Sequence, residues 1–140
     1  MMHVGVDYGR SRTGFAVCLN GVVMPREPLL DSSWDRIAGR LLSMEEEAGP
    51  VTVVLGLPLS ASGRPTELSR EVEGLAGHLR ERGFEVETVS EVGSSEEASD
   101  ASGNPGIRNR RGYGNGMGHY DGRLDSMAAM VILKRYLGLP

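Results

Sequence analysis

The sequence predicts an α/β fold in which a mixed sheet of five strands is flanked by helices. Three observations carry this prediction. Short β-branched runs open the chain, strands alternate with helical periodicity in its second half, and Gly, Asn and Pro separate the segments. Short loops join the first three strands, so we expect them to form an antiparallel meander at one edge of the sheet.

The opening stretch HVGVDYGRSRTGFAV contains two strands joined by a glycine-containing loop. Val4 and Val6 precede the loop, and Phe15 and Val17 follow it, all with side chains that strands favour. The dipeptide Asn20–Gly21 then predicts a tight hairpin turn into the third strand.

Hydrophobic spacing places the other elements. They are expected as strands at residues 51–58 and 84–91 and as helices at residues 31–49, 66–83 and 124–138. Residues 94–101 could form a further short helix. Apolar residues recur at helical spacing in the first helix, at Trp34, Ile37, Ala38, Leu41 and Leu42. The run VTVVLGLP is continuously apolar, which is typical of a strand buried on both faces.

Length and composition favour a single domain over residues 1–140. A chain of this size can bury a core without disulfides, and the lone Cys18 predicts a buried free thiol. No signal-peptide pattern or membrane-length apolar run is present, so we expect a cytoplasmic protein. The net charge of −4 argues against nucleic-acid binding over the whole surface but leaves room for a local basic patch. The oligomeric state stays open, with a homodimer as one option.

Three acidic residues stand where strands end or where the last helix begins. Asp7 ends the first strand, Glu91 ends the last strand, and Asp125 shares a helix face with Ala128 and Ile132. Strand ends of an open α/β sheet often form functional sites. Three acids at one edge would repel one another unless cations bind them, and carboxylate oxygens suit Mg²⁺ or Mn²⁺. One or two such ions could support phosphodiester hydrolysis.

Each acid also has a simpler interpretation. Asp7 could cap the following turn, and Asp125 could cap its helix. Glu91 could be a solvated charge beside Glu96 and Glu97. Only the joint placement of the three acids favours a metal site over these alternatives.

Residues 103–122 form a segment rich in Gly and Arg, which we expect to be a flexible loop when no ligand is bound. Arginines contact phosphates, and tyrosines can stack on unpaired bases. Two arginines just after Asp7 could extend the same basic rim. The candidate nucleic-acid contacts are therefore Arg10, Arg12, Arg108, Arg110, Arg111, Tyr113 and Arg123.

Three motifs resemble the YqgF family of pre-16S rRNA nucleases and Holliday junction resolvase-like proteins. They are GVDYGRSRTGFAV, VVLGLPLSASGRPTE and LDSMAAMVILKRYL, in the order and spacing of that family. The resemblance implies a ribonuclease H-like fold and a Mg²⁺- or Mn²⁺-dependent nuclease, with Asp7, Glu91 and Asp125 as catalytic and metal-binding residues. The implied activity is processing of the 5′ end of pre-16S rRNA, with cleavage of a Holliday junction as the alternative.

The segment SEVGSSEEA departs from the DERlTt..A pattern of that family. Ser90 and Val92 replace the Asp and Arg that normally flank Glu91. The missing Arg removes a phosphate contact or an anchor for the acids. A catalytically degenerate nucleic-acid-binding module is therefore an alternative from another class. An actin-like ATPase or sugar kinase would need two domains, for which this chain is too short.

Overall fold

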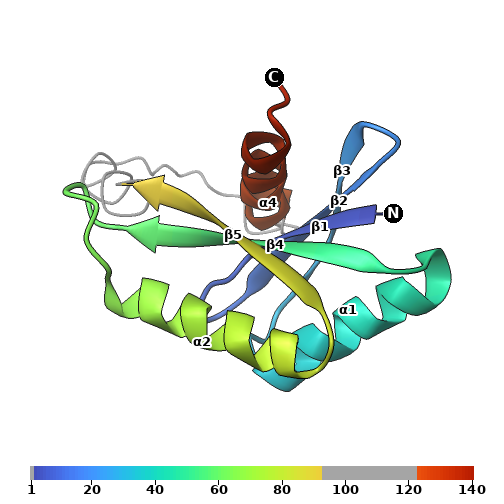
Figure 1. Ribbon diagram of the computed structural model, residues 1–140, viewed down its shortest axis with the longest axis horizontal. Coiled ribbons are helices and arrows are strands. Elements are labelled where there is room, and N and C mark those ends of the chain that lie inside the picture. The colour runs from blue at the N-terminus through green and yellow to red at the C-terminus, as the bar shows by residue number, and fades with distance from the viewer. Residues whose placement is uncertain (1, 93–122) are drawn as a thin grey trace, which may run out of the picture.

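The computed structural model describes residues 2–92 and 123–140. The strands are β1 (Met2–Asp7), β2 (Thr13–Leu19), β3 (Val22–Leu29), β4 (Val51–Leu59) and β5 (Glu85–Val92). The helices are α1 (Trp34–Ala48), α2 (Glu67–Glu81) and α4 (Arg123–Leu137) (Figure 1). The short helix expected at residues 94–101 and the loop expected at 103–122 lie outside the described residues. None of the helices described here has the length and apolar character needed to cross a bilayer.

The strands form one mixed sheet in the order β3-β2-β1-β4-β5. Strands β1, β2 and β3 pair antiparallel, and β4 pairs parallel with both β1 and β5. Asn20 and Gly21 have φ values of 56° and 82°, the left-handed conformations that a two-residue hairpin turn needs. The predicted α/β sheet with its antiparallel meander is therefore confirmed.

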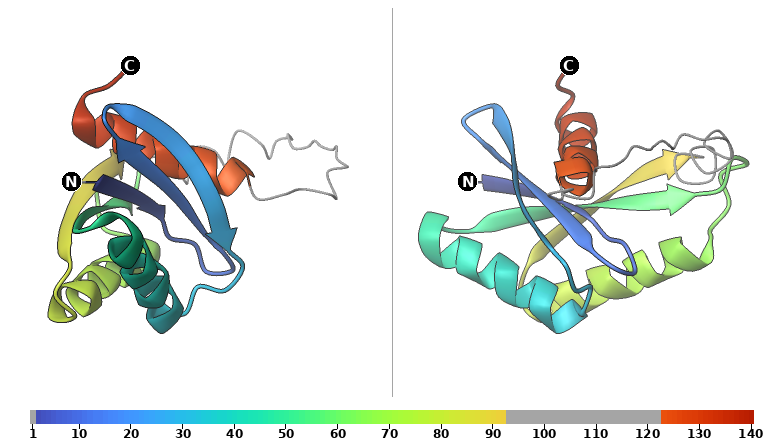
Figure 2. Two further views of the ribbon diagram at one scale, coloured as in Figure 1. Left: turned by 90° about the vertical axis from the view of Figure 1, so that its right-hand side faces the viewer. Right: turned by 180° about the vertical axis from the view of Figure 1, so that it is seen from behind.

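Helices cover both faces of this sheet. Figures 1 and 2 show α1 and α2 on one face and α4 on the other. Alternate residues of β1 and β4 pack against α1 and α2, so the larger core lies on that side; its fully buried members include Val4, Val6, Val53, Leu55, Ile37, Leu41, Leu75 and Leu79. A smaller cluster lies under α4 and contains Ala16, Cys18, Val54, Ala129, Ile132 and Leu133. Cys18 is buried as a free thiol, as expected.

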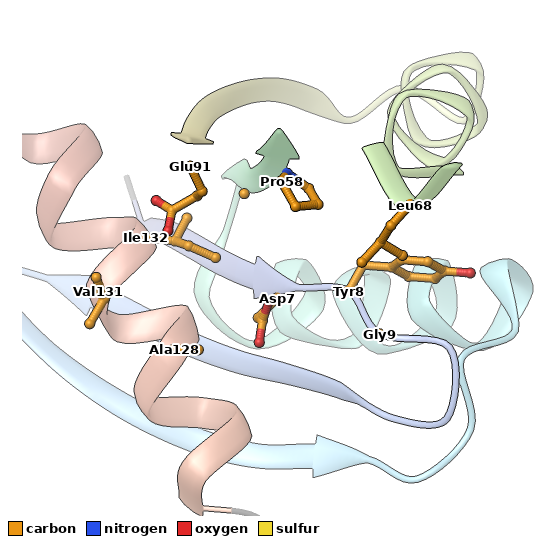
Figure 3. Close-up of a pocket in the computed structure, with 10 residues that line it drawn as sticks. Asp7, Tyr8, Gly9, Pro58, Leu68, Glu91, Ala128, Val131 and Ile132 are labelled. Carbon is orange, nitrogen blue, oxygen red and sulfur yellow. The ribbon is translucent and has the colours of Figure 1, made fainter. Parts of the chain in front are cut away.

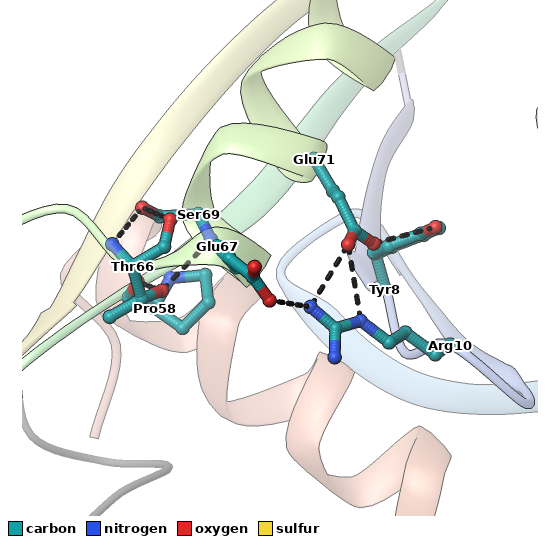
Figure 4. Close-up of polar contacts among 7 residues, drawn as sticks. All are labelled: Tyr8, Arg10, Pro58, Thr66, Glu67, Ser69 and Glu71. Atoms are coloured by element: carbon teal, nitrogen blue, oxygen red, sulfur yellow. Dashed lines mark hydrogen bonds and ion pairs between the residues drawn. The ribbon is translucent and has the colours of Figure 1, made fainter.

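Local signals fix where α1 and α2 begin. The Ser33 hydroxyl accepts a hydrogen bond from the Arg36 N–H at 3.4 Å and caps α1. Thr66 and Ser69 form a reciprocal capping box at the start of α2. The Thr66 hydroxyl also donates a hydrogen bond to the carbonyl oxygen of Pro58, near the carboxyl end of β4 (Figure 4). The first turn of α2 therefore stands beside the end of that strand.

Two glycines let α4 approach the sheet closely. A Cβ atom at Gly5 would lie 2.6 Å from the Ala129 carbonyl oxygen, and one at Gly56 would lie 2.5 Å from Ile132 Cδ1. Any side chain at these positions would push the helix away. The Ser126 hydroxyl also donates a 2.5 Å hydrogen bond to the Arg26 carbonyl of β3. These contacts set the height and direction of α4 over the sheet.

Candidate active site

A cavity of about 450 Å³ opens at the carboxyl ends of β1, β4 and β5, beside α4 (Figure 3). Strands β1, β4 and β5 run parallel, so their carboxyl ends meet at one edge. The lining residues are Asp7, Tyr8, Gly9, Gly56, Pro58, Leu68, Glu91, Ala128, Val131 and Ile132. Two of the three acids singled out in the sequence thus face one cavity.

Strand register explains why Asp7 and Glu91 face α4. Val6 pairs with Leu55, and both side chains lie in the core under α1 and α2. Successive side chains of a strand alternate between faces, so Asp7 points to the opposite side. Glu91 pairs with Pro58, another cavity residue, and so lies on the α4 face as well.

Gly56 separates the two acids on the intervening strand β4. A Cβ atom there would lie 3.7 Å from Glu91 Cγ, in addition to its clash with Ile132. The missing side chain therefore leaves room for Ile132 to pack against β4 at the floor of the cavity, between β1 and β5. The sequence interpretation did not single out Gly56, because the need for a glycine here becomes visible only when α4 is placed on the sheet.

Glu91 is held in a largely buried environment. Its side chain is 13% exposed, and Arg135 Nε of α4 lies 3.3 Å from Glu91 Oε2. Burying a carboxylate without a partner is costly, and this ion pair offsets part of that cost. Arg135 was not among the sequence candidates. Its one available signal was its position three residues after Ile132, on the same side of the helix.

Arg10 points to α2 and pairs with its acids. Its Nε donates to Glu71 Oε2 at 3.1 Å, and a terminal nitrogen lies 3.4 Å from Glu67 Oε1 (Figure 4). Tyr8 donates its hydroxyl to Glu71 Oε1 at 3.3 Å. The hydrogen bond and charge of Glu71 raise the pKa of Arg10 above its ordinary value. Arg10 thus ties the β1–β2 loop to α2, and its contact with nucleic acid stays a prediction.

The structure describes only some of the other candidate residues. Arg12 lies exposed in the β1–β2 loop. Asp125 and Arg123 belong to the first turn of α4, but their side chains lie outside the described part of the chain. Four further candidates lie outside the described residues altogether: Arg108, Arg110, Arg111 and Tyr113.

Asp7 and Glu91 fit a hard divalent cation by their chemistry. They bring two carboxylates to one cavity, and oxygen ligands of this kind suit Mg²⁺ or Mn²⁺. No cluster of three metal-ligating side chains occurs within residues 2–92 and 126–140. The third expected carboxylate is that of Asp125.

Known proteins similar to this chain identify its family. The family model described as "RuvX: Holliday junction resolvase" matches residues 1–138. The chain belongs to the RuvX family. A relative from Oleidesulfovibrio alaskensis is 36% identical over 143 residues, covering 100% of this chain and 94% of the relative. One from Sulfurovum sp. is 32% identical over 140 residues, covering 99% and 100%. Both carry the name "Putative pre-16S rRNA nuclease".

The fold of this RuvX-family chain is similar to that of T. thermophilus RuvC, solved in complex with a Holliday junction substrate. The TM-score is 0.50 at 17% sequence identity, with 95% of this chain and 90% of RuvC covered. At that identity the similarity shows the fold alone. The expected family and the ribonuclease H-like fold are both confirmed.

Proposed function

We propose that this RuvX-family protein is a Mg²⁺- or Mn²⁺-dependent nuclease that processes the 5′ end of pre-16S rRNA. The observation that carries the proposal is the convergence of Asp7 and Glu91, from the two strands flanking β4, on one cavity beside α4. The full-length relatives named as pre-16S rRNA nucleases support the choice of RNA as substrate.

Asp7, Glu91 and Asp125 would hold the cation. Position 125 precedes Ala128 and Ile132 by three and seven residues, a spacing that repeats on one side of a helix. A divalent ion bound there would polarise the scissile phosphate and lower the pKa of an attacking water. The protein would contribute the orientation of its carboxylates and, through Pro58 and Leu68, an apolar wall that limits access of bulk water.

Basic residues would bind the substrate backbone. The proposed contacts are Arg10, Arg12, Arg108, Arg110, Arg111, Tyr113 and Arg123. Glu67 and Glu71 already pair with Arg10 through its Nε and one terminal nitrogen, so a phosphate would compete with these two acids for the guanidinium. Its contribution to binding should therefore be smaller than that of an arginine that does not pair with acids.

Branched DNA is the second candidate substrate, favoured by the description of the matching family model. A binding module without catalysis is the third, motivated by Ser90 and Val92 beside Glu91. The same acidic cavity could serve either nuclease, since the chemistry acts on the phosphodiester backbone.

A side-by-side cleavage assay separates these functions. The parent and the Asp7→Asn variant would be incubated with Mn²⁺ and either a labelled RNA carrying the 5′ precursor region of 16S rRNA or a four-way DNA junction. We expect the parent to cleave the RNA faster than the junction, and the variant to cleave neither. Faster cleavage of the junction would move the resolvase to first place. Binding of both without cleavage would favour the binding module and contradict the nuclease.

A further inference from the structure

Arg135 is a cation of α4 that reaches the acidic cavity. Its Nε lies 3.3 Å from Glu91 Oε2, while its own side chain is 54% exposed. The carboxylate at the other end of this pair is only 13% exposed. The attraction is therefore stronger than that of an ordinary surface ion pair, although solvent at Arg135 weakens it.

The helix delivers Arg135 to this place for two reasons. Ala128 and Ile132 line the cavity, and position 135 follows them by seven and three residues, so it continues the same side of α4. Gly56 allows Ile132 to lie against the strand, which brings this side of α4 close to Glu91 (Figure 3). Arg135 also stands in the last turn, where a cation is favoured by the helix dipole.

We propose that Arg135 is the built-in counter-cation of Glu91, which holds this carboxylate when no divalent ion is bound and competes with the ion for it. The inference rests on the proposed role of Glu91 as a metal ligand. A positive charge beside a ligand carboxylate disfavours a second cation on that carboxylate. Arg135 therefore stabilises the metal-free protein and lowers its affinity for Mg²⁺ or Mn²⁺. It is a positioning residue, because it acts through Glu91.

The two effects predict opposite changes in one variant. Arg135→Met keeps most of the alkyl chain but removes the charge, so Glu91 loses its ion pair with position 135. Without metal the variant should melt at a lower temperature than the parent. In a Mn²⁺ titration followed by thermal unfolding, its half-saturating concentration should be roughly three- to tenfold lower than that of the parent.

Control variants separate this pairing from general effects of charge. Arg135→Lys keeps the charge and should keep a Mn²⁺ response close to that of the parent. Lys134→Met removes a charge from the neighbouring position, about 100° around the helix, and should change the Mn²⁺ response little. In the Glu91→Gln background, Arg135→Met should lower the metal-free melting temperature less than it does in the parent, because only the interaction with the helix dipole is lost, and it should not alter the response to Mn²⁺. Arg135→Gln repeats the test if the Met variant folds poorly.

The outcomes distinguish this inference from the proposed function. If the parent binds Mn²⁺ and Arg135→Met has the same or a weaker affinity, the counter-cation role is overturned while the metal site stands. An equal gain in the Lys134→Met variant would overturn it too, because the effect would then be one of net charge. If Mn²⁺ does not stabilise the parent at all, the metal site and this inference fail together.

Discussion

Gly56 shows how one residue determines the geometry of the cavity. It lies on β4, between the strands that carry Asp7 and Glu91, and Ile132 of α4 occupies the space where a side chain would be. The residue therefore allows the close approach of the helix to the strand that lies between the two acids. Its role can be tested through stability, independently of any catalytic activity.

Gly56→Ala should lower the free energy of unfolding by about 1–3 kcal/mol, because the new methyl group would overlap Ile132 Cδ1 and Cγ1. Urea unfolding followed by circular dichroism measures this change. Gly77→Ala is the matched control. It adds the same methyl group within α2, where no atom from outside the neighbouring helix backbone lies within 4 Å, and should be neutral or stabilising. Equal stability of Gly56→Ala and the parent would contradict the close packing of α4.

Substitution of Asp7 tests the proposed metal site directly at the residue scale. If Asp7 binds a divalent ion, Mn²⁺ should raise the melting temperature of the parent by mass action, and Asp7→Asn should remove most of that rise. Asp35→Asn serves as the control, because Asp35 pairs with Arg82 and does not line the cavity. A full response to Mn²⁺ in Asp7→Asn would exclude Asp7 as a ligand.

At the scale of elements, β5 separates the acid from its altered neighbours. Ser90 pairs with Leu57, whereas Glu91 pairs with Pro58, so the two side chains lie on opposite faces of the sheet. Val92 returns to the face of Ser90 and is 53% exposed. This alternation is that of a regular strand. It means that the departure at positions 90 and 92 leaves the α4 face of the strand intact.

Restoring the family's pattern with Ser90→Asp and Val92→Arg should raise the cleavage rate and leave the Mn²⁺ response nearly unchanged. The new charges would lie on the face away from the cavity and would act by supporting Glu91 or the substrate. Single-turnover cleavage of the precursor RNA measures the effect. Glu91→Gln should abolish cleavage in both backgrounds. A parent that cleaves as fast as the restored variant would show that the departure is neutral.

The Gly- and Arg-rich segment at residues 103–122 can be tested separately. Changing Arg108, Arg110 and Arg111 together to Ala should weaken RNA binding across sequences and flatten its dependence on salt, since fewer phosphates would be neutralised. The melting temperature should change little if the segment contributes little to the core. Filter binding at several salt concentrations gives the slope. An unchanged affinity and slope would contradict the basic-patch interpretation.

At the scale of the whole molecule, periodicity and turn residues were enough to predict the order of the described strands and helices. They predicted the core of α1 less well in its second half than at Ile37 and Ala38, which are both buried. Leu41 is buried, whereas Leu42 is 51% exposed and Met44 takes the next place in the core.

Residues at strand ends could be located from the sequence. Asp7 and Glu91 lie at the ends of β1 and β5 and line one cavity, and their role in catalysis stays a prediction. Contacts between distant elements could not. Arg10 meets Glu67 and Glu71 across more than 50 residues of sequence, and Arg135 meets Glu91 only because α4 crosses the sheet above Gly56.

The central claim is that a nuclease acts at the cavity between Asp7, Glu91 and α4. Its most direct test compares the cleavage rate of precursor RNA by Glu91→Gln and Glu87→Gln in saturating Mn²⁺. Glu87 lies four residues before Glu91 on β5, so its side chain is on the same face of the sheet. It does not line the cavity. We predict that Glu91→Gln loses cleavage by about 100-fold or more while Glu87→Gln cleaves at the parent rate. Equal rates in the two variants would contradict the assignment of this cavity as the active site.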